Sequence, residues 1–333
     1  MATIRDVAKQ ARVSVATVSR VLNGNGYVNL ATEAKVRMAM EELNYEPNTV
    51  ARGLAGKRTM MIAMILPDIV NPFFSELARA VEDTARAHQF TVIICNSDDR
   101  GAKEKTYIDV LRKRYVDGII FASNTLGDEE ILTMEEQEIP FVLLDRTPGM
   151  GRCSVVRSRN VDGARMAVNH LLQSGCRRVA HIAGSGDLLT GRERRRGYLD
   201  VVGEKGWFDP GLIVPGHFSV EGGKGAAMAL MDHFPDVDGI FAGNDLMAVG
   251  ALKVLHAMGV KVPDEVSLCG FDGIALTEVT VPELTTVAQP IYEMGATAAM
   301  ELIRLIEGEP GGPREYELDV LLLKRESTRR RKR

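Results

Sequence analysis

The sequence predicts an α/β protein with an N-terminal three-helix helix-turn-helix head, a hinge helix, and a two-lobed core of doubly wound parallel sheets. Three short helical patterns follow one another within residues 4–43. In the rest of the chain, short apolar runs alternate with helical patterns in two similar series, which is typical of parallel sheets covered by helices. A length of 333 residues, with 45% hydrophobic and 26% charged residues, suits a globular chain of about two domains and a small extra module.

The net charge of −4 conceals an uneven distribution of charge along the chain. Residues 1–59 contain nine Lys or Arg and five Asp or Glu, and residues 324–333 contain seven against one. The remainder is therefore strongly acidic. A basic head on an acidic body indicates that the head meets a polyanion. We interpret the run Arg329–Arg333 as a solvated, frayed end.

The composition also argues against several classes of protein. No apolar stretch approaches the roughly 18–20 residues that span a bilayer, and the N-terminus shows no apolar signal segment, so we expect a cytoplasmic protein without a membrane partner. The four cysteines and six histidines are scattered, which predicts neither disulfides nor a metal site. We interpret the pair Asp98-Asp99 as solvated loop charges and His181 as a core histidine.

No nucleotide-binding or catalytic motif is complete. Gly184-Ser185-Gly186 follows a predicted strand, but Leu189 stands where a dinucleotide fingerprint needs its third glycine. We therefore expect a tight turn there, and neither a cofactor nor an enzymatic activity. An enzyme on a doubly wound fold remains an alternative that lacks a catalytic constellation.

The three helices of the head follow from apolar spacing and capping residues. Thr3 can cap a helix over residues 4–11, whose apolar positions recur on one face. Ser14 can cap a second helix over about 15–22, and Thr32 a third over about 33–43. Two short helices with a tight turn, followed by a third, are typical of a head whose second helix enters the major groove of DNA.

The body shows two series of strands and helices. Apolar runs predict strands over 60–66, 91–95, 118–122, 140–144, 178–183, 239–242, 266–270 and, at the end, 316–324. Helical patterns lie over 72–88, 102–114, 128–138, 161–174, 192–205, 222–233, 245–258 and 291–306. Ligands of such sheets lie beyond the carboxyl ends of the strands, so two facing lobes predict a site in the cleft between them.

These elements predict the domain boundaries. We expect a head over 1–46, a hinge over 47–57, a core over 58–327 that carries the ligand site and the dimer contacts, and a basic tail over 328–333. The core divides into an N-lobe, about 58–158 and 290–316, and a C-lobe, about 159–289 and 317–327.

The head resembles that of the lactose-repressor family of transcription factors. The resemblance rests on the motifs Ile4-Arg5-Asp6-Val7-Ala8 and Thr17-Val18-Ser19-Arg20-Val21-Leu22-Asn23. It implies base contacts from Val15, Ala16 and Arg20, where Arg20 can bind guanine and the other two offer apolar contact. The remaining head residues expected on DNA are short polar side chains suited to phosphates: Thr3, Ser14, Thr17, Ser19, Asn23 and Thr32.

Residues 45–56 resemble the hinge helix of the same family. The resemblance implies that Leu54 wedges into a base step from the minor groove, as apolar wedges do when they kink DNA. Asn48, Ala51 and Arg52 lie nearby on that resemblance. A plain flexible linker over the same residues is the alternative.

The body is similar to periplasmic sugar-binding proteins, and most similar to those that bind ribose. Polar and aromatic residues follow the predicted strand ends, where carboxylates, amides and guanidinium groups suit sugar hydroxyls and phenyl rings suit the apolar face of a sugar. Ten residues match positions of sugar contacts in the ribose-binding pattern: Asn71, Phe73, Phe74, Asp145, Arg146, Arg194, Phe218, Asn244, Asp272 and Gln289.

The combined resemblance implies a repressor that binds palindromic operator DNA as a homodimer and responds to a sugar, with D-ribose as inducer. Alternatives stay open. The chain could be a sugar-binding protein of a transport system, although the basic head argues against this. It could also be a regulator of the same family that answers to another pentose or hexose, to a phosphosugar, or to a corepressor protein.

Overall fold

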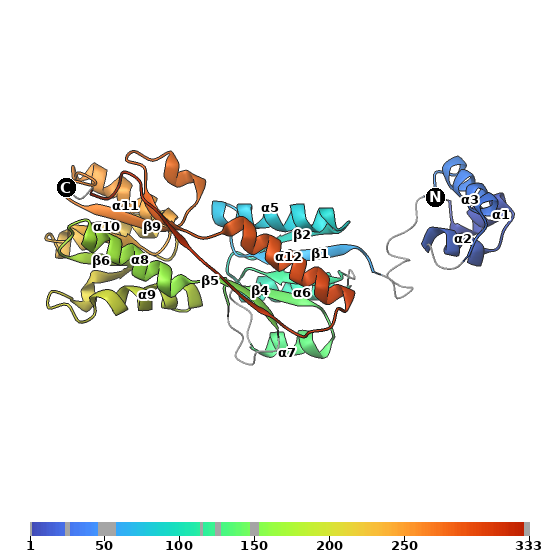
Figure 1. The fold of residues 1–333 in the computed structure, drawn as a ribbon, viewed down its shortest axis with the longest axis horizontal. Helices are drawn as coiled ribbons and strands as arrows, with labels where there is room; N and C mark the ends of the chain where they lie inside the picture. The colour runs from blue at the N-terminus through green and yellow to red at the C-terminus, as the bar shows by residue number, and fades with distance from the viewer. Residues whose placement is uncertain are drawn as a thin grey trace. The chain divides into compact units, whose positions relative to one another are not determined.

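A computed structural model describes residues 2–23, 27–45, 58–113, 116–123, 128–146 and 153–329, without the side chains of residues 23 and 128–130. The chain forms two compact units, residues 1–59 and 60–333, and each is treated by itself below (Figure 1). The predicted hinge, with Asn48, Ala51 and Leu54, lies outside the described residues.

The head consists of three helices around a small apolar core. The helices are α1 (Ile4–Ala11), α2 (Val15–Asn23) and α3 (Leu30–Glu42). Val7, Val18 and Val36, one from each helix, are fully buried and belong to the same hydrophobic cluster. Apolar residues of all three helices therefore share one core.

Two of the three predicted helix caps are confirmed and one is wrong. The Thr3 hydroxyl accepts a hydrogen bond from Asp6 N, and the Asp6 carboxylate accepts one from Thr3 N, a reciprocal capping box. Ser14 Oγ accepts a hydrogen bond from Thr17 N at 3.1 Å. Helix α3 begins at Leu30, because Asn29 caps it by accepting from Thr32 N at 2.8 Å. Asn caps at least as well as Thr and comes earlier in the chain.

The N-lobe contains a six-stranded sheet in the order β11-β5-β4-β3-β1-β2, with parallel pairing throughout. Its strands are β1 (Met61–Leu66), β2 (Thr91–Asn96), β3 (Gly118–Phe121), β4 (Phe141–Leu144), β5 (Ser154–Ser158) and β11 (Glu315–Leu318). Its helices are α5 (Pro72–Ala87), α6 (Gly101–Lys113), α7 (Asp128–Glu136) and α12 (Ile291–Glu307). Apolar residues of α5 and α12 share one core cluster, and those of α6 and α7 share another, so helices cover both faces of the sheet.

The C-lobe repeats this arrangement with the sheet order β12-β10-β9-β8-β6-β7. Its strands are β6 (Val179–Ala183), β7 (Ile213–Pro215), β8 (Gly239–Ala242), β9 (Ser267–Asp272), β10 (Thr285–Ala288) and β12 (Leu321–Leu323). Its helices are α8 (Asn160–Gln173), α9 (Leu189–Val202), α10 (Val220–His233) and α11 (Asp245–Ala257). The pairs α10 with α11 and α8 with α9 contribute to separate core clusters. The alternation seen in the sequence thus produces two doubly wound lobes.

The chain passes between the lobes at three places: after β5, after β10 and after β11. The first two crossings are tied together, because Ser158 Oγ donates a hydrogen bond to Gln289 Oε1 at 2.6 Å. Strand β12 then pairs antiparallel with β10 in the C-lobe. The predicted single strand over 316–324 is wrong: the segment forms two strands that belong to different sheets.

One further expectation is corrected at the end of the chain, and one is confirmed in the C-lobe core. Arg329 is not part of a frayed end, because its guanidinium donates to the backbone oxygens of Pro263, Asp264 and Glu265 and pairs with Asp238. His181 is a buried core residue, as predicted, and its Nδ1 is 2.9 Å from the Phe241 carbonyl oxygen. None of the helices among the described residues is long and apolar enough to cross a membrane.

Candidate DNA-binding surface and effector pocket

Helix α2 exposes the three residues that were predicted to contact bases. Val15 is 42% exposed, and Ala16 and Arg20 are also exposed, whereas Val18 of the same helix is fully buried. An apolar side chain in water at the first turn of a helix gains by contact with a thymine methyl group, and a free guanidinium can bind guanine. The exposed face of α2 therefore carries side chains suited to a DNA-recognition helix.

The short polar residues of the head take part in local structure. The hydroxyls of Ser14 and Thr17 are 2.9 Å apart, and the Thr3 hydroxyl also donates to Asp6 Oδ2 at 2.7 Å. Ser19 and Thr32 are half-buried, and the side chain of Asn23 lies outside the described residues. Their contacts with phosphates stay predictions.

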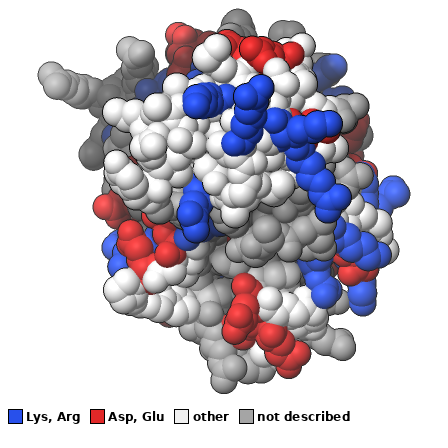
Figure 2. All heavy atoms as spheres, turned by 90° about the vertical axis from the view of Figure 1, so that its right-hand side faces the viewer, with Lys and Arg blue, Asp and Glu red and all other residues white. Residues whose placement is uncertain are grey.

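Positive charge is available on the surface of the head. Arg5, Lys9, Arg12, Arg20 and Lys35 are all exposed. Figure 2 shows one face of the molecule, on which Lys and Arg side chains gather in the upper and right-hand parts and Asp and Glu side chains form separate groups. Exposed cations of this kind neutralise phosphates when DNA binds.

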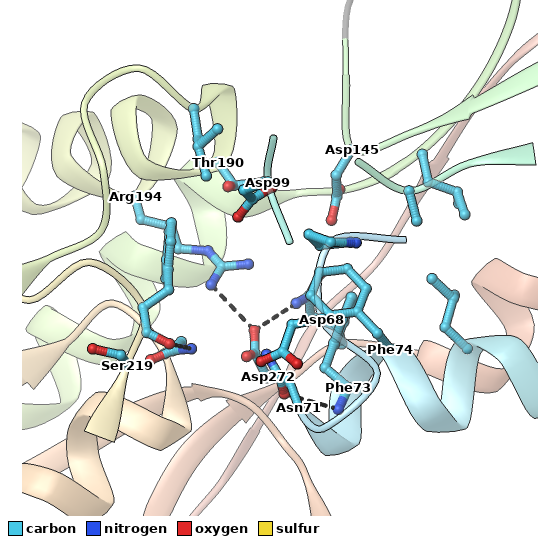
Figure 3. A pocket seen from close by; sticks show the side chains of 18 of the residues that line it. Asp68, Asn71, Phe73, Phe74, Asp99, Asp145, Thr190, Arg194, Ser219 and Asp272 are labelled. Atoms are coloured by element: carbon cyan, nitrogen blue, oxygen red, sulfur yellow. Dashed lines mark hydrogen bonds and ion pairs between the residues drawn. The ribbon is translucent and has the colours of Figure 1, made fainter. Parts of the chain in front are cut away.

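A pocket of about 200 Å³ lies between the two lobes. Nine of the ten residues predicted to contact sugar line it (Figure 3): Asn71, Phe73, Phe74, Asp145, Arg194, Phe218, Asn244, Asp272 and Gln289. They come from the loops that follow β1, β4 and β8, from the first turn of α5, from the end of β9, from α9, and from the segments before α10 and α12. The two sheets therefore present the carboxyl ends of their strands to one cavity, as expected for this fold.

Asp272 forms the centre of the polar side of the pocket. Its Oδ1 accepts a hydrogen bond from Arg194 Nη1 at 3.1 Å and another from Gln289 Nε2 at 2.8 Å, and Figure 3 shows the Arg194 guanidinium pointing toward the Asp272 carboxylate. All three residues are buried. The arrangement combines a carboxylate, a guanidinium and an amide, which can exchange hydrogen bonds with adjacent hydroxyl groups.

A second layer of hydrogen bonds fixes this group. Arg194 also donates to Asn160 Oδ1 at 2.9 Å and to the Gly243 carbonyl oxygen at 2.6 Å. Asp272 has a φ of 118°, a backbone conformation that costs energy for a residue with a side chain. The next two backbone N–H groups, of Gly273 and Ile274, donate to Asp245 Oδ2. Asp245 thereby holds the turn that aims Asp272 into the pocket.

Burial raises the pKa of Asp272, and the nearby Arg194 and Gln289 oppose the shift. Burial is the main cause that raises the pKa of Asp245, and the negative charge of Asp272 raises it further. Two carboxylates in one dry region each disfavour ionisation of the other. The ion pair with Arg194 favours the charged form of Asp272 and so opposes these two effects.

Aromatic rings form the apolar side of the pocket. Phe73 and Phe74 pack edge to face, with ring centroids 5.1 Å apart. Phe218 lies under the Arg194 guanidinium at 5.8 Å, and its carbonyl oxygen accepts a hydrogen bond from Asn244 Nδ2. A side chain at Gly184 would place a Cβ 2.0 Å from the Phe218 ring. The predicted turn at 184–186 thus needs glycine because the ring lies against the backbone.

Arg146 is the predicted contact that does not line the pocket in this structure. It follows Asp145, whose φ of 48° turns the chain at the end of β4, and its positive charge acts on Cys153 instead. Its role at the sugar stays a prediction.

The sequence analysis did not select several residues that line the pocket. They are Asp68, Asp99, Leu188, Thr190, His217 and Ser219 among others. Asp68 and Asp99 follow β1 and β2, which are neighbours in the sheet, so the rule that selected Asp272 could have found both. Asp98 is exposed and pairs with Lys103 at 2.8 Å, as a solvated charge would, but Asp99 belongs to the pocket.

Comparisons with known proteins agree with both parts of the chain. Residues 3–48 match the family described as bacterial regulatory proteins of the lacI family, and residues 59–326 match periplasmic binding proteins and the sugar-binding domain of the LacI family. The chain is 45% identical over 329 residues to a ribose operon repressor of Halalkalibacterium halodurans, covering 99% of this chain and 98% of the relative.

Two solved structures show the same likeness. A lac repressor dimer bound to operator and an anti-inducer has a TM-score of 0.87 at 28% identity, covering 99% of each chain. A LacI-family transcriptional regulator from Enterococcus faecium with bound ribose has a TM-score of 0.73 at 33% identity, covering 81% of this chain and 98% of that one.

A helix-turn-helix head followed by a two-lobed sugar-binding core defines a class of protein, the DNA-binding transcriptional regulators that carry a domain of periplasmic-binding type. The sequence matches extend over nearly the whole length of the chain. This chain belongs to the LacI family of bacterial regulatory proteins.

Proposed function

We propose that the chain is a repressor that binds a palindromic operator as a homodimer and releases it when D-ribose binds between the lobes. The pocket carries this proposal, because its lining combines the Arg194–Asp272–Gln289 group with the rings of Phe73, Phe74 and Phe218. Its volume of about 200 Å³ is below the roughly 300–1,000 Å³ typical of drug-sized ligands, which favours a monosaccharide. The ribose operon repressor and the ribose-bound regulator among the relatives support the choice of ribose.

The proposed mechanism couples the two parts of the chain. A single short reading helix contacts too few base pairs for specificity, so two copies bind two half-sites. Ribose draws the lobes together around Asp272 and Arg194, which changes how the N-lobes of the dimer present their hinges, residues 47–57, to the operator. Such a protein acts on DNA in the cytoplasm and needs no enzymatic activity.

This mechanism requires negative coupling between ribose and operator. Ribose must weaken operator binding by the same factor by which operator weakens ribose binding, and couplings of about 1–3 kcal/mol are typical. Isothermal titration calorimetry of the full chain with D-ribose, with and without operator duplex, measures how far operator weakens ribose binding. Fluorescence anisotropy of labelled operator, with and without D-ribose, measures how far ribose weakens operator binding.

Equal loss of affinity in both directions supports the proposal. Tighter operator binding in the presence of ribose would make ribose a corepressor. Absence of ribose binding would leave the DNA-binding assignment in place and overturn the effector.

A further inference from the structure

The pocket contains more negative than positive charge. Four aspartates line it: Asp68, Asp99, Asp145 and Asp272. Among the described residues that line the pocket, Arg194 is the one Lys or Arg side chain. Figure 3 shows aspartates around the cavity on several sides, from the loops of both lobes. Any ligand that enters therefore meets an excess of carboxylates.

The charge of Arg194 is already used by the deeper aspartates. Arg194 pairs with Asp272 at 3.1 Å, and its charge also acts on Asp145, where it opposes the rise in pKa that burial causes. Because the positive charge of Arg194 is already paired with a buried carboxylate, it attracts a second anion less strongly than an unpaired guanidinium would.

Asp68 and Asp99 form a separate acidic pair on the N-lobe side of the pocket. They follow the neighbouring strands β1 and β2, and both are exposed to solvent. Although Asp99 contacts solvent, the protein atoms around it reduce its hydration, and this effect, followed by the charge of Asp68, raises the pKa of Asp99. Asp68 Oδ1 accepts a hydrogen bond from Val70 N at 2.9 Å, which orients the carboxylate without neutralising it.

One feature of the pocket favours an anion. Thr190 in the first turn of α9 lines the pocket, and the helix begins without a side-chain cap at Leu188. A helix N-terminus is equivalent to about half a positive charge. Two carboxylates at the same pocket outweigh it, so the local field repels a phosphate group.

We infer that Asp68 and Asp99 are specificity determinants that admit neutral sugars and exclude phosphorylated ones. The inference rests on the proposed function, because it takes the pocket to be a sugar site. It narrows the ligand class to uncharged polyhydroxy compounds. Like charges placed together at a binding site weaken binding strongly, and a phosphosugar brings close to two negative charges to this site.

The test compares neutral sugars with their phosphates on the full chain by isothermal titration calorimetry. We expect D-ribose 5-phosphate to bind at least about a hundredfold more weakly than D-ribose. The quantity compared is the ratio of the Kd for D-ribose 5-phosphate to the Kd for D-ribose. In the double variant Asp68→Asn, Asp99→Asn, this ratio should fall about tenfold or more, since near-isosteric amides remove the negative charge. Raising the salt concentration should also narrow the ratio in the wild type, because exposed charges are screened.

The matched control is Asp232→Asn, Asp264→Asn, which makes the same change in net charge at exposed positions that do not line the pocket. It should leave the ratio unchanged. Circular dichroism of both double variants verifies that they fold. Equal affinity of the wild type for D-ribose and its 5-phosphate, or an unchanged ratio in the pocket variant, would overturn the inference.

A second pair of ligands separates this inference from the identity of the effector. One outcome is that D-glucose binds while D-ribose and D-glucose 6-phosphate do not. In that case the choice of ribose as effector is wrong, and the inferred exclusion of phosphorylated sugars stands. If only the phosphorylated member of a pair binds, or if no neutral sugar binds at all, the selectivity is wrong.

Discussion

Asp272 combines an unusual backbone conformation with a carboxylate at the centre of the polar side of the pocket. Its backbone is held at a φ of 118° by bonds from the following peptide groups to Asp245. Its carboxylate accepts from both Arg194 and Gln289. A substitution at this position therefore changes the pocket and leaves the residues of helix α2 unchanged.

We expect Asp272→Ala to weaken ribose binding at least about tenfold, because loss of a hydrogen-bonded charged partner costs about 1–3 kcal/mol and 1.4 kcal/mol is a factor of ten. Operator affinity without sugar should stay at the wild-type value. Calorimetry and anisotropy on the same preparation measure both quantities. Asp264→Ala, at an exposed position, is the control, and wild-type ribose affinity in Asp272→Ala would remove Asp272 from the site.

Arg20 offers a test at the other end of the chain. If Arg20 binds a guanine, Arg20→Ala should cost about 1–3 kcal/mol and relax the preference at one base pair of each half-site. Binding to operators with every base at that position, and to random duplex, gives the measurement. Equal loss on operator and random DNA would assign Arg20 to a phosphate instead.

The residues of the pocket were predictable where a polar residue lies at or just beyond the end of an apolar strand. Asn244 and Asp272 are of this kind. Asp99 was not selected, because a pair of aspartates in a loop is usually solvated and the sequence does not say which member faces the other lobe. In the structure, Asp98 pairs with Lys103 and Asp99 lines the pocket.

At the scale of elements, a buried cluster fastens the last part of the chain to the N-lobe. Glu301 in α12 is almost fully buried and accepts from Arg304 of the same helix. It also accepts from Ser154 Oγ at the start of β5 and from Tyr316 OH in β11. One carboxylate thus links a helix and two strands of the N-lobe.

We expect Glu301→Ala to lower the free energy of unfolding by about 3–5 kcal/mol, because it leaves the buried Arg304 guanidinium without its counter-charge. Glu293→Ala, at an exposed position of the same helix, should change it little. Urea denaturation measures both. The double variant Glu301→Ala, Arg304→Met should lose less than Glu301→Ala alone, and a larger loss would contradict the role of the unpaired charge.

The strands that sequence patterns predicted include those with uninterrupted apolar runs, such as β1 and β4. Strands β5, β7 and β10 were not predicted, since Ser, Thr, Arg or Pro interrupts their apolar residues. Their places are set by neighbouring strands. The division of 316–324 into β11 and β12 was equally hard to predict, because the two strands are separated by only two residues and only the fold assigns them to different sheets.

The stability of the whole core should depend on pH through His181. The ring is fully buried between Tyr198 and Phe241, with ring centroids 5.2 and 4.8 Å away. Burial lowers its pKa to about 4 from 6.5. The unfolded chain therefore takes up a proton below pH 6.5 that the folded chain refuses until about pH 4.

We expect the folded state to lose about 3 kcal/mol through this residue as the pH falls across that range. His181→Asn retains a donor for the Phe241 carbonyl and removes the titration, so its stability should fall less steeply with acid. Urea denaturation between pH 7 and pH 4 gives the comparison, with His256→Asn at an exposed position as control. Parallel curves for wild type and His181→Asn would refute the assignment.

The crossings between the lobes determine when the protein can assemble during synthesis. Residues 60–158 supply most of the N-lobe, but α12 and β11 follow the whole C-lobe in the chain. At roughly 5–20 residues per second, the ribosome needs about 10–30 s to reach β11 after β5. Meanwhile the apolar face that Leu77 and Val81 share with α12 stays uncovered. A nascent chain that stalls before residue 291 carries a DNA-reading head without a complete sensor, and its exposed apolar face marks it for chaperones and proteases.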